Sequence, residues 1–276
     1  MISVVIITYN RKLLLKDCLN SVLGQNNCPD FEIIVVDNHS SDRTADLIRD
    51  NFRERLRLIP CETRLSLAEA KRLGLNACAG DIIAFTDDDC LAGKNWLKEI
   101  NLTLSRNDFC GGPTLLKDIS LPRWWNGSLN WMIGINTLPG VKFPPLGGNA
   151  AFRKYVLDRV EKDAPPRELL PYGEDNWRIR KALAAGFSLG INKDMVVYHQ
   201  IPQKKLTLSF LFQRSAQEGR CLANYDKKTR DIAYNLFSIP ANLLRSLFFL
   251  DLNRFFRMIV NLSYLINRLK RPKNER

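Results

Sequence analysis

The chain has 276 residues, of which 45% are apolar, so it can form one large folded domain with or without an appendage. Its formal net charge of +12 is unevenly distributed, because residues 1–203 hold 26 Lys and Arg against 24 Asp and Glu, whereas residues 204–276 hold 15 against 5. A basic character confined to the C-terminal quarter argues against a general nucleic-acid-binding protein and predicts a local contact with something anionic.

The cysteines and the N-terminus favour a cytoplasmic protein. The seven cysteines include no Cys-x-x-Cys pair, which is typical of reduced core residues rather than of a disulfide framework or a zinc site. The N-terminus lacks a basic leader, and its apolar run is too short for a signal peptide. No window of about 18 uninterrupted apolar residues predicts a simple membrane span.

The first part of the chain alternates between predicted strands and helices. The continuous Val and Ile runs at 2–8 and 31–37 are typical of parallel strands buried on both faces. Between them, apolar side chains at helical spacing predict a helix that ends near Gly24. The remaining elements of this alternation are helices over 41–52 and 66–78, the latter capped by Ser66, and strands over 55–59 and 81–86. This alternation predicts an α/β fold with a mostly parallel, Rossmann-like sheet.

Polar clusters follow three of these strands: Thr8-Tyr9-Asn10, Asp37-Asn38 and Asp87-Asp88-Asp89. In open parallel sheets, ligands bind beyond the carboxyl ends of the strands. The three clusters therefore predict a binding site at one edge of the sheet.

After about residue 106 the alternation loosens. Residues 122–146 are rich in Trp, Gly and Pro and predict a long ordered loop with at most one helix. Further predicted elements are a strand over 147–153, a helix over 173–186 and a strand over 194–200. We expect a single domain over 1–203 and a basic, amphipathic helical region over 204–276.

Three consecutive aspartates at the end of one predicted strand repel one another unless they are held apart or neutralised. A solvated polar turn is the alternative, although one or two acidic residues would serve it. Carboxylate oxygens suit Mg²⁺ or Mn²⁺, and such ions complete their shell with phosphates and water. The cluster therefore predicts a nucleotide diphosphate bridged through a metal ion.

Glu174 and Asp175 begin a predicted helix, where the helix dipole stabilises acidic side chains, so ordinary first-turn chemistry is one interpretation. Together with a metal cluster on the same domain, a carboxylate positioned as a general base is the better interpretation.

Six strings in order, "SVVIITYNR", "EIIVVDNHSSD", "AFTDDDC", "GGNAAFR", "YGED" and "VYH", resemble an inverting family 2 glycosyltransferase with the GT-A fold over roughly residues 1–200. The resemblance implies that Thr8, Asn10 and Asp37 hold the nucleoside, with Asp37 accepting from the uracil N–H. It also implies the roles of the acidic residues: Asp87 lies near the ribose, Asp89 binds the metal, and Asp175 is the catalytic base.

His199 falls where the family often places a histidine near the metal or the diphosphate, although a structural role is an equal alternative. The stretch "CETRLSLAEAKRLGL" departs from the family pattern, because Lys71 and Arg72 replace an Arg-Asn pair. These two residues are expected to supply charge to the diphosphate. The Gln-x-x-Arg-Trp element of processive synthases is missing, which favours transfer of a single sugar.

Sugar contacts are expected from aromatic residues and from a glycine pair. Trp124, Trp125, Trp131 and Trp177 are candidates for stacking on a sugar, with core packing as the alternative. We expect the backbone at Gly147, Gly148 and Asn149 to approach the donor or acceptor closely, unless it forms a plain turn, and Glu174 to lie near the sugars.

The C-terminal region is helical in period and too apolar to be freely solvated. Arg254, Arg257, Asn261 and Arg268 share one face of the last predicted helix, with Phe and Leu on much of the rest. Such helices lie on anionic membrane surfaces, which would suit a lipid-linked acceptor at the inner face of the cell membrane. Packing on the catalytic domain, or on a second copy of the chain in a homodimer, is the alternative for residues 232–276.

The predicted function is a metal-dependent inverting glycosyltransferase that uses a nucleotide-sugar, UDP-linked, and a glycan or lipid-linked acceptor. A nucleotidyltransferase would require a glycine- and lysine-rich phosphate loop after the first strand, and "TYNRKLLLKD" has none. A non-catalytic nucleotide-sugar-binding subunit at a membrane is the alternative from another class, and the presence of both Asp89 and Asp175 argues against it.

Overall fold

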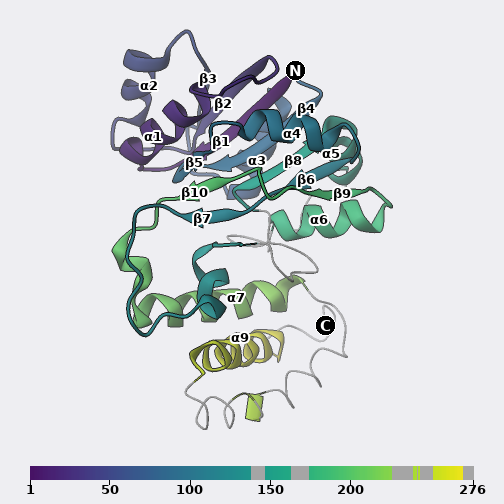
Figure 1. Ribbon diagram of the computed structural model, residues 1–276. Coiled ribbons are helices and arrows are strands. Elements are labelled where there is room, and N and C mark those ends of the chain that lie inside the picture. The colour runs from purple at the N-terminus through teal and green to yellow at the C-terminus, as the bar shows by residue number, and fades with distance from the viewer. Residues whose placement is uncertain (138–146, 163–173, 226–238, 241, 243–250, 270–276) are drawn as a thin grey trace. The chain divides into compact units, whose positions relative to one another are not determined.

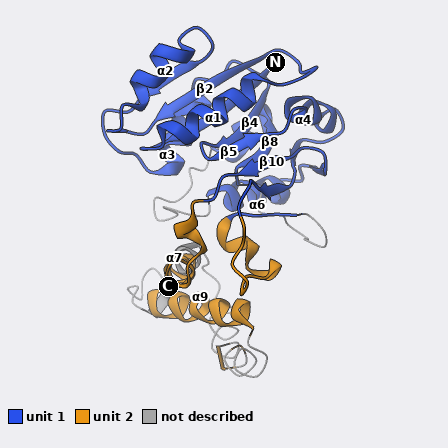
Figure 2. Ribbon diagram, turned by 60° about the vertical axis from the view of Figure 1, so that its left-hand side comes forward, with its two compact units in different colours: residues 1–119, 134–165, 174–201 blue, residues 120–133, 166–173, 202–276 orange. Residues whose placement is uncertain are grey.

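Figure 1 shows the computed structural model of the chain, which describes residues 1–137, 147–162, 174–225, 239–240, 242 and 251–269. The chain divides into two compact units (Figure 2). Unit 1 comprises residues 1–119, 134–165 and 174–201, and unit 2 comprises residues 120–133, 166–173 and 202–276. The expected division at residue 203 stays a prediction.

Unit 1 is built around a seven-stranded sheet with the order β3-β2-β1-β4-β8-β6-β9. The strands are β1 (Ile2–Thr8), β2 (Phe31–Asp37), β3 (Arg57–Pro60), β4 (Ile82–Asp87), β6 (Phe109–Gly111), β8 (Asn149–Arg153) and β9 (Leu189–Ile191). Strands β1 to β4 run parallel to one another, whereas β8 is antiparallel to both of its neighbours. The predicted α/β fold with a mostly parallel sheet is confirmed.

Helices α1 (Lys12–Leu23), α2 (Thr44–Phe52), α3 (Leu67–Asn76), α4 (Trp96–Leu104), α5 (Lys154–Val160) and α6 (Glu174–Ala184) belong to the same unit. Helix α3 begins with a capping box, in which Ser66 accepts from the backbone N–H of Glu69 and the Glu69 carboxylate accepts from Ser66. Helix α4 lies outside the predicted elements, although Trp96, Leu97 and Ile100 are buried at helical spacing.

The ends of the first strands are level with one another. The register pairs Thr8 with Asp37 and Ile7 with Asp87, so the polar residues that follow β1, β2 and β4 meet at one edge of the sheet. Continuous burial of β1 explains its uninterrupted Val and Ile run, since both faces of the strand pack against apolar side chains.

The strand predicted over 194–200 exists as β10 (Val197–His199), but it belongs to a second sheet. This three-stranded sheet has the order β5-β10-β7, with β5 (Cys90–Ala92) antiparallel and β7 (Thr114–Leu116) parallel to β10. The register places His199 opposite Cys90, the residue after the three aspartates.

In unit 2, the described elements are the 3₁₀ helices η1 (Gly127–Ile133) and η3 (Gln203–Leu206) and the helices α7 (Leu208–Tyr225) and α9 (Leu252–Leu269). Helices α7 and α9 pack together, as expected for a helical C-terminal region. The Oγ of Ser263 donates to the backbone carbonyl of Ala216 at 2.6 Å. At the same crossing, a Cβ atom added to Gly219 would meet the backbone oxygen of Val260 at 2.1 Å, so only glycine fits.

The tryptophans of unit 2 differ in their exposure and in their contacts. Trp125 is buried, whereas the neighbouring Trp124 is exposed. The Nε1 of Trp131 donates to Asn253 at 3.0 Å, and Arg257 lies over the Trp131 ring. Trp131 therefore packs against α9.

The expected loop residues 138–146 and the side chain of Arg268 lie outside the described part of the chain.

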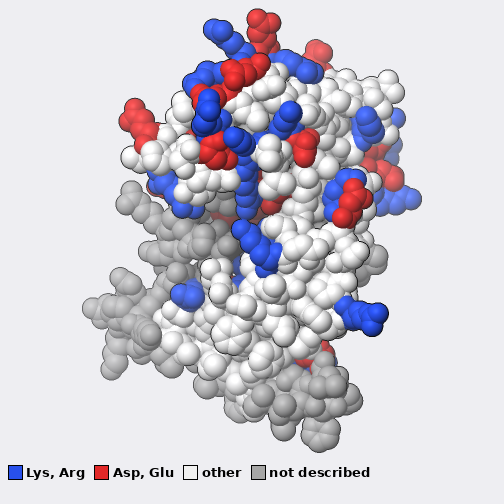
Figure 3. All heavy atoms as spheres, turned by 90° about the vertical axis from the view of Figure 1, so that its left-hand side faces the viewer, with Lys and Arg blue, Asp and Glu red and all other residues white. Residues whose placement is uncertain are grey.

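Charges of both signs are interspersed on the described surface that Figure 3 shows, without a continuous field of either sign. None of the helices in the described residues combines the length and the apolar character that crossing a bilayer requires.

Candidate active site

Asp87 ends β4, and Asp88 and Asp89 form the turn between β4 and β5, where both contact Arg11 in the loop after β1. The Thr8 hydroxyl donates to Oδ2 of Asp88 at 2.8 Å, and the Arg11 Nη1 donates to Oδ1 of the same carboxylate at 2.8 Å. The same Arg11 nitrogen donates to Oδ2 of Asp89 at 3.0 Å. One guanidinium group therefore offsets part of the repulsion between two of the carboxylates.

Burial leaves this turn electrostatically strained. Burial, followed by the negative charge of Asp89, raises the pKa of Asp88 to about 6, against the attraction of Arg11. Burial also raises the pKa of Asp87, although Lys71 favours its charged form. A bound cation would relieve both effects.

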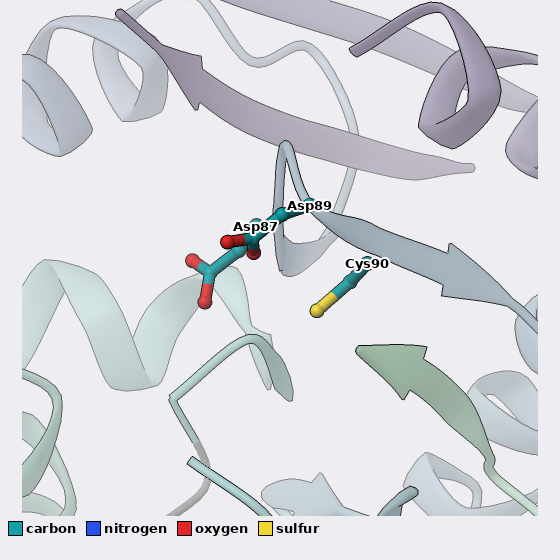
Figure 4. A group of neighbouring side chains, drawn as sticks. All are labelled: Asp87, Asp89 and Cys90. Carbon is teal, nitrogen blue, oxygen red and sulfur yellow. The ribbon is translucent and has the colours of Figure 1, made fainter. Parts of the chain in front are cut away.

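The ligand atoms of Asp87, Asp89 and Cys90 lie within 4.8 Å of one another. Figure 4 shows these three side chains, which come from the end of β4, the turn and the start of β5, respectively. Burial and the neighbouring carboxylates raise the pKa of the Cys90 thiol well above its usual value. Because a protonated thiol is a poor ligand, the oxygen atoms of the two aspartates are the better candidates.

His199 adds a nitrogen ligand to this group. Its Nε2 lies 3.2 Å from Oδ2 of Asp89, yet this buried atom makes no hydrogen bond of acceptable geometry with any described residue. A buried ring nitrogen without a hydrogen bond fits a metal ligand, and the carboxylate oxygens of Asp87 and Asp89 suit Mg²⁺ or Mn²⁺. The residues present therefore fit a divalent cation held by Asp89 and His199.

A second charged cluster joins α3 to α6. The Lys71 Nζ donates to Oε1 of Glu174 at 2.9 Å and to Oδ1 of Asp175 at 2.8 Å. The Lys71 and Glu174 side chains are 5% and 4% exposed, whereas 27% of the Asp175 side chain is exposed. Arg178 lies 3.6 Å from Oδ1 of Asp175 and donates to Glu161 at 2.6 Å.

The two carboxylates of this cluster differ in proton affinity. Burial and the adjacent charge of Glu174 raise the pKa of Asp175 to about 6, although Lys71 and Arg178 favour its ionised form. Burial alone would raise the pKa of Glu174, but Lys71 and Arg178 outweigh it and lower that pKa. Asp175 is therefore the group that can take up a proton near neutral pH, as a general base must.

The glycine pair before β8 lies between the two clusters. A Cβ atom added to Gly148 would meet Oδ2 of Asp87 at 2.6 Å, and one added to Gly147 would lie 3.7 Å from Oδ2 of Asp175. Two consecutive glycines therefore each lie beside one carboxylate, Gly147 beside Asp175 and Gly148 beside Asp87. The expected close approach of this backbone to the donor or acceptor stays a prediction.

The residues expected to hold the nucleoside form hydrogen bonds with their neighbours at one edge of the sheet. The Asn10 Oδ1 accepts from the Ser41 backbone N–H at 2.7 Å, and Oδ1 of Asp37 accepts from the Ser40 N–H at 3.0 Å. The Thr8 side chain is buried and donates to Asp88. The structure brings all three to the predicted edge, and their contacts with a nucleoside stay a prediction.

Arg72 is not placed with its neighbour Lys71. Lys71 is buried against carboxylates, whereas Arg72 is exposed and lines a surface hollow that includes Cys78, Leu157 and Glu161. Consecutive helical residues point about 100° apart, so both cannot face one ligand. Lys71 contacts Glu174 and Asp175, and the expected contacts of both cations with a diphosphate stay a prediction.

Two residues predicted to contact a sugar, Asn149 and Trp177, have buried side chains, and their contacts with a sugar stay a prediction. Asn149 is fully buried, and its amide nitrogen donates to the backbone oxygens of Pro113 and Met195 while its oxygen accepts from Trp96. Its side chain therefore holds segments of unit 1 together. Trp177 is 6% exposed, which favours the packing alternative over sugar stacking.

Arg11 lies outside the predicted set, and Asp88 is predicted only as a member of the aspartate cluster, without a role of its own. Their signal in the sequence is charge alone: a single arginine follows the polar end of β1, and an acidic run follows β4. The two segments are 77 residues apart, so only the sheet order shows that they meet.

The family model described as Glycosyl transferase family 2 matches residues 3–161 of the chain. Over 205 residues, the chain is 25% identical to the glycosyltransferase AglE of Haloferax volcanii, which covers 72% of this chain and 66% of AglE. It is 34% identical over 104 residues to a validoxylamine A glucosyltransferase of Streptomyces hygroscopicus subsp. limoneus, covering 36% of this chain and 23% of that enzyme. The chain thus spans less than two thirds of the length of these relatives.

Solved structures share the fold over nearly the whole chain. The mannosyltransferase PcManGT of Pyrobaculum calidifontis, in complex with GDP-Man and Mn²⁺, has a TM-score of 0.65 at 18% identity and covers 98% of this chain and 87% of its own. S. aureus TarS in complex with UDP has a TM-score of 0.58 at 16% identity and covers 97% of this chain and 90% of its own. These similarities establish the GT-A fold.

Proposed function

Because the chain belongs to glycosyl transferase family 2, we propose that it is a metal-dependent, inverting enzyme that transfers one sugar from a nucleotide diphosphate donor to a hydroxyl of a glycan or lipid-linked acceptor. The observation that carries this proposal is that the neighbouring residues Gly147 and Gly148 lie beside Asp175 and Asp87, respectively, because a Cβ atom added to them would come within 3.7 Å and 2.6 Å of the carboxylate oxygens. One short segment therefore lies beside two carboxylates with different roles. Asp87 belongs to the cluster that would bind the metal and the leaving group, and Asp175 is the carboxylate that would activate the nucleophile.

The leaving-group side consists of the aspartate turn and the residues that surround it. Asp89 and His199 would hold the divalent ion, which when bound supplies Lewis-acid stabilisation of charge on the departing diphosphate. Arg11 is 41% exposed at its side chain, so its guanidinium can also contact a phosphate oxygen.

The nucleophile side consists of Asp175 and its cations. The acceptor hydroxyl forms the new bond to the anomeric carbon while the bond from that carbon to the diphosphate oxygen breaks and its electron pair leaves with the diphosphate. The hydroxyl proton passes to the Asp175 carboxylate. Attack from the side opposite the leaving group inverts the configuration.

Support for a nucleotide-sugar donor comes from the family, and two neighbours of the same fold carry UDP and GDP-Man. A uridine donor is proposed because Asp37 stands at the position that the family resemblance assigns to the uracil contact. Binding of UDP, GDP and their sugars, with and without Mn²⁺, tests this choice by calorimetry, and tighter binding of GDP than of UDP would contradict it.

The central experiment replaces Asp175 by Asn and measures Mn²⁺-dependent transfer or hydrolysis with the donor that binds. We expect donor affinity to be unchanged and turnover to fall by roughly 10²–10⁴-fold, the usual contribution of a positioned general base. Asp158→Asn, at an exposed carboxylate that pairs with Lys154, is the matched control. Near-normal turnover of the Asp175 variant would place the base elsewhere, and a wild-type protein that binds but never turns over donor would support a non-catalytic subunit.

A peripheral attachment of unit 2 to an anionic membrane is part of the proposal. On α9, Leu262 and Ile266 are 45% and 44% exposed, and Arg257 is also exposed, so apolar and basic side chains are both available to a lipid surface. Flotation with vesicles that contain or lack anionic lipid tests this role in the full chain. The variant Leu262→Gln/Ile266→Gln should lose binding to anionic vesicles, and equal flotation of variant and wild type would exclude a role for this face.

A further inference from the structure

Lys71 is a buried ammonium group of unit 1, and its two hydrogen bonds both go to carboxylates of helix α6. Its side chain is 5% exposed and lies 2.9 Å from Oε1 of Glu174 and 2.8 Å from Oδ1 of Asp175. Burying a lysine is costly unless carboxylates offset the lost hydration. Its location therefore indicates a specific task at these carboxylates.

The two oxygens of Asp175 are in different surroundings. Oδ1 accepts from Lys71 and lies near Arg178, whereas Oδ2 faces Gly147, at which an added Cβ would lie 3.7 Å away. Within the described residues, no side chain or backbone group forms a hydrogen bond with Oδ2. One oxygen is thus anchored, and the other remains available to a ligand on the glycine side.

We propose that Lys71 is a positioning residue for the base: it holds Oδ1 of Asp175 so that Oδ2 faces the acceptor hydroxyl, and it favours the ionised carboxylate. This inference rests on the proposed function, in which Asp175 takes the acceptor proton. It assigns to Lys71 a role on the nucleophile side, in place of the expected contact with the diphosphate.

The charges around Asp175 support this assignment. They come from Lys71 on α3, from Glu174 and Arg178 on α6, and from Glu161 just after α5, which pairs with Arg178. Asp87 at the end of β4 acts on this group through its attraction to Lys71. With Lys71 and Arg178 positive and Glu161, Glu174 and Asp175 negative, the cluster of five has a net charge of −1. One proton on Asp175 makes it neutral, so the product of proton transfer is electrostatically acceptable.

The direct test measures the Asp175 carboxyl without any substrate. Aspartate labelled with ¹³C at the side-chain carboxyl reports each titration by NMR, and the resonance of Asp175 is identified by its loss in Asp175→Asn. Removal of the positive charge in Lys71→Met should raise the pKa of Asp175 by roughly 1–3 pH units, whereas removal of the negative neighbour in Glu174→Gln should lower it. Arg72→Met, at the exposed next residue of the same helix, should leave it unchanged.

A pKa of Asp175 that rises in Lys71→Met and falls in Glu174→Gln would support the proposal. An unchanged pKa of Asp175 in a folded Lys71→Met protein would overturn it. If Lys71→Met does not fold, Glu174→Gln decides alone: a lower pKa supports the electrostatic role, and an unchanged one contradicts it. The second measurement is the pH dependence of kcat for Mn²⁺-dependent donor hydrolysis. The pH below which kcat falls should shift by the same amount as the pKa of Asp175 measured by NMR, while the donor KM stays constant. A protein that titrates as expected but does not turn over would contradict the proposed function and leave the Lys71 contact intact.

Discussion

Arg11 and Asp89 are joined by a hydrogen bond of 3.0 Å between Nη1 and Oδ2, so the carboxylate proposed as metal ligand is paired with a guanidinium group. The same nitrogen contacts Asp88, which makes Arg11 a cation of the protein itself at the aspartate turn. A divalent ion that binds Asp89 must compete with this contact.

The first prediction concerns that competition. Arg11→Gln should bind Mn²⁺ in the absence of nucleotide more tightly, by roughly fivefold, because a partly exposed ion pair of about 1 kcal/mol no longer opposes metal entry. Electron paramagnetic resonance of free Mn²⁺ measures the affinity. Arg43→Gln, which removes an exposed ion pair with Asp46, is the control, and weaker metal binding by the Arg11 variant would contradict the prediction.

The second prediction concerns the pH dependence of stability in the metal-free protein. The folded-state pKa of Asp88 is about 6, above the value of about 3.9 for an unfolded chain. The folded state therefore binds the proton more tightly between these values, so this residue makes the free energy of unfolding rise as the pH falls from 7 toward 4. Asp88→Asn should flatten this rise and add on the order of 1–2 kcal/mol at pH 7.

Urea titrations at pH 7, 6 and 5 in the presence of a chelator measure this effect. Asp158→Asn serves again as the exposed control. An Asp88 variant that is less stable than wild type at pH 7, with the wild-type pH dependence, would show that the contacts of Asp88 with Thr8 and Arg11 outweigh its burial.

The third prediction tests the glycine pair. Gly148→Ala would bring a Cβ within 2.6 Å of Oδ2 and 2.9 Å of Cγ of Asp87, so the carboxylate must move. We expect Mn²⁺-dependent nucleotide binding to weaken by roughly tenfold or more and stability to fall by about 1–3 kcal/mol. Gly147→Ala is the matched control, since its Cβ would make an ordinary contact of 3.7 Å. Equal behaviour of the two variants in calorimetry would refute the packing at Asp87.

The fourth prediction concerns unit 2. Alanine normally stabilises a helix interior relative to glycine by roughly 0.5–1 kcal/mol. At position 219, the added Cβ would meet the Val260 carbonyl oxygen, so Gly219→Ala should instead lower stability by about 1–3 kcal/mol. Thermal unfolding compares it with Arg220→Ala at the exposed next position. A higher melting temperature for the Gly219 variant would mean that α7 and α9 do not cross closely there.

Local patterns were sufficient for much of the fold. Buried strands β1, β2 and β4 show as Val and Ile runs because both of their faces are covered, and α3 begins at Ser66 because its cap is local. Short strands such as β6 and β9, with three residues each, have too few side chains for a recognisable period. Helix α4 does have apolar residues at helical spacing, and it lies between the aspartate cluster and the Trp-rich loop.

The sequence by itself determined which acidic groups stand at strand and helix ends, because polar residues directly after an apolar run can be recognised without any partner. Only the tertiary structure decided what each of them faces. Lys71 and Asp175 are separated by 104 residues, and Arg11 and Asp89 by 78. His199 reaches Asp89 because β10 pairs with β5 in a second sheet, not because of any local pattern. Hydrophobic periodicity indicates the environment of a residue within its own helix or strand. The distant partner that a side chain contacts depends on strand order and helix packing, which cannot be read from a single sequence.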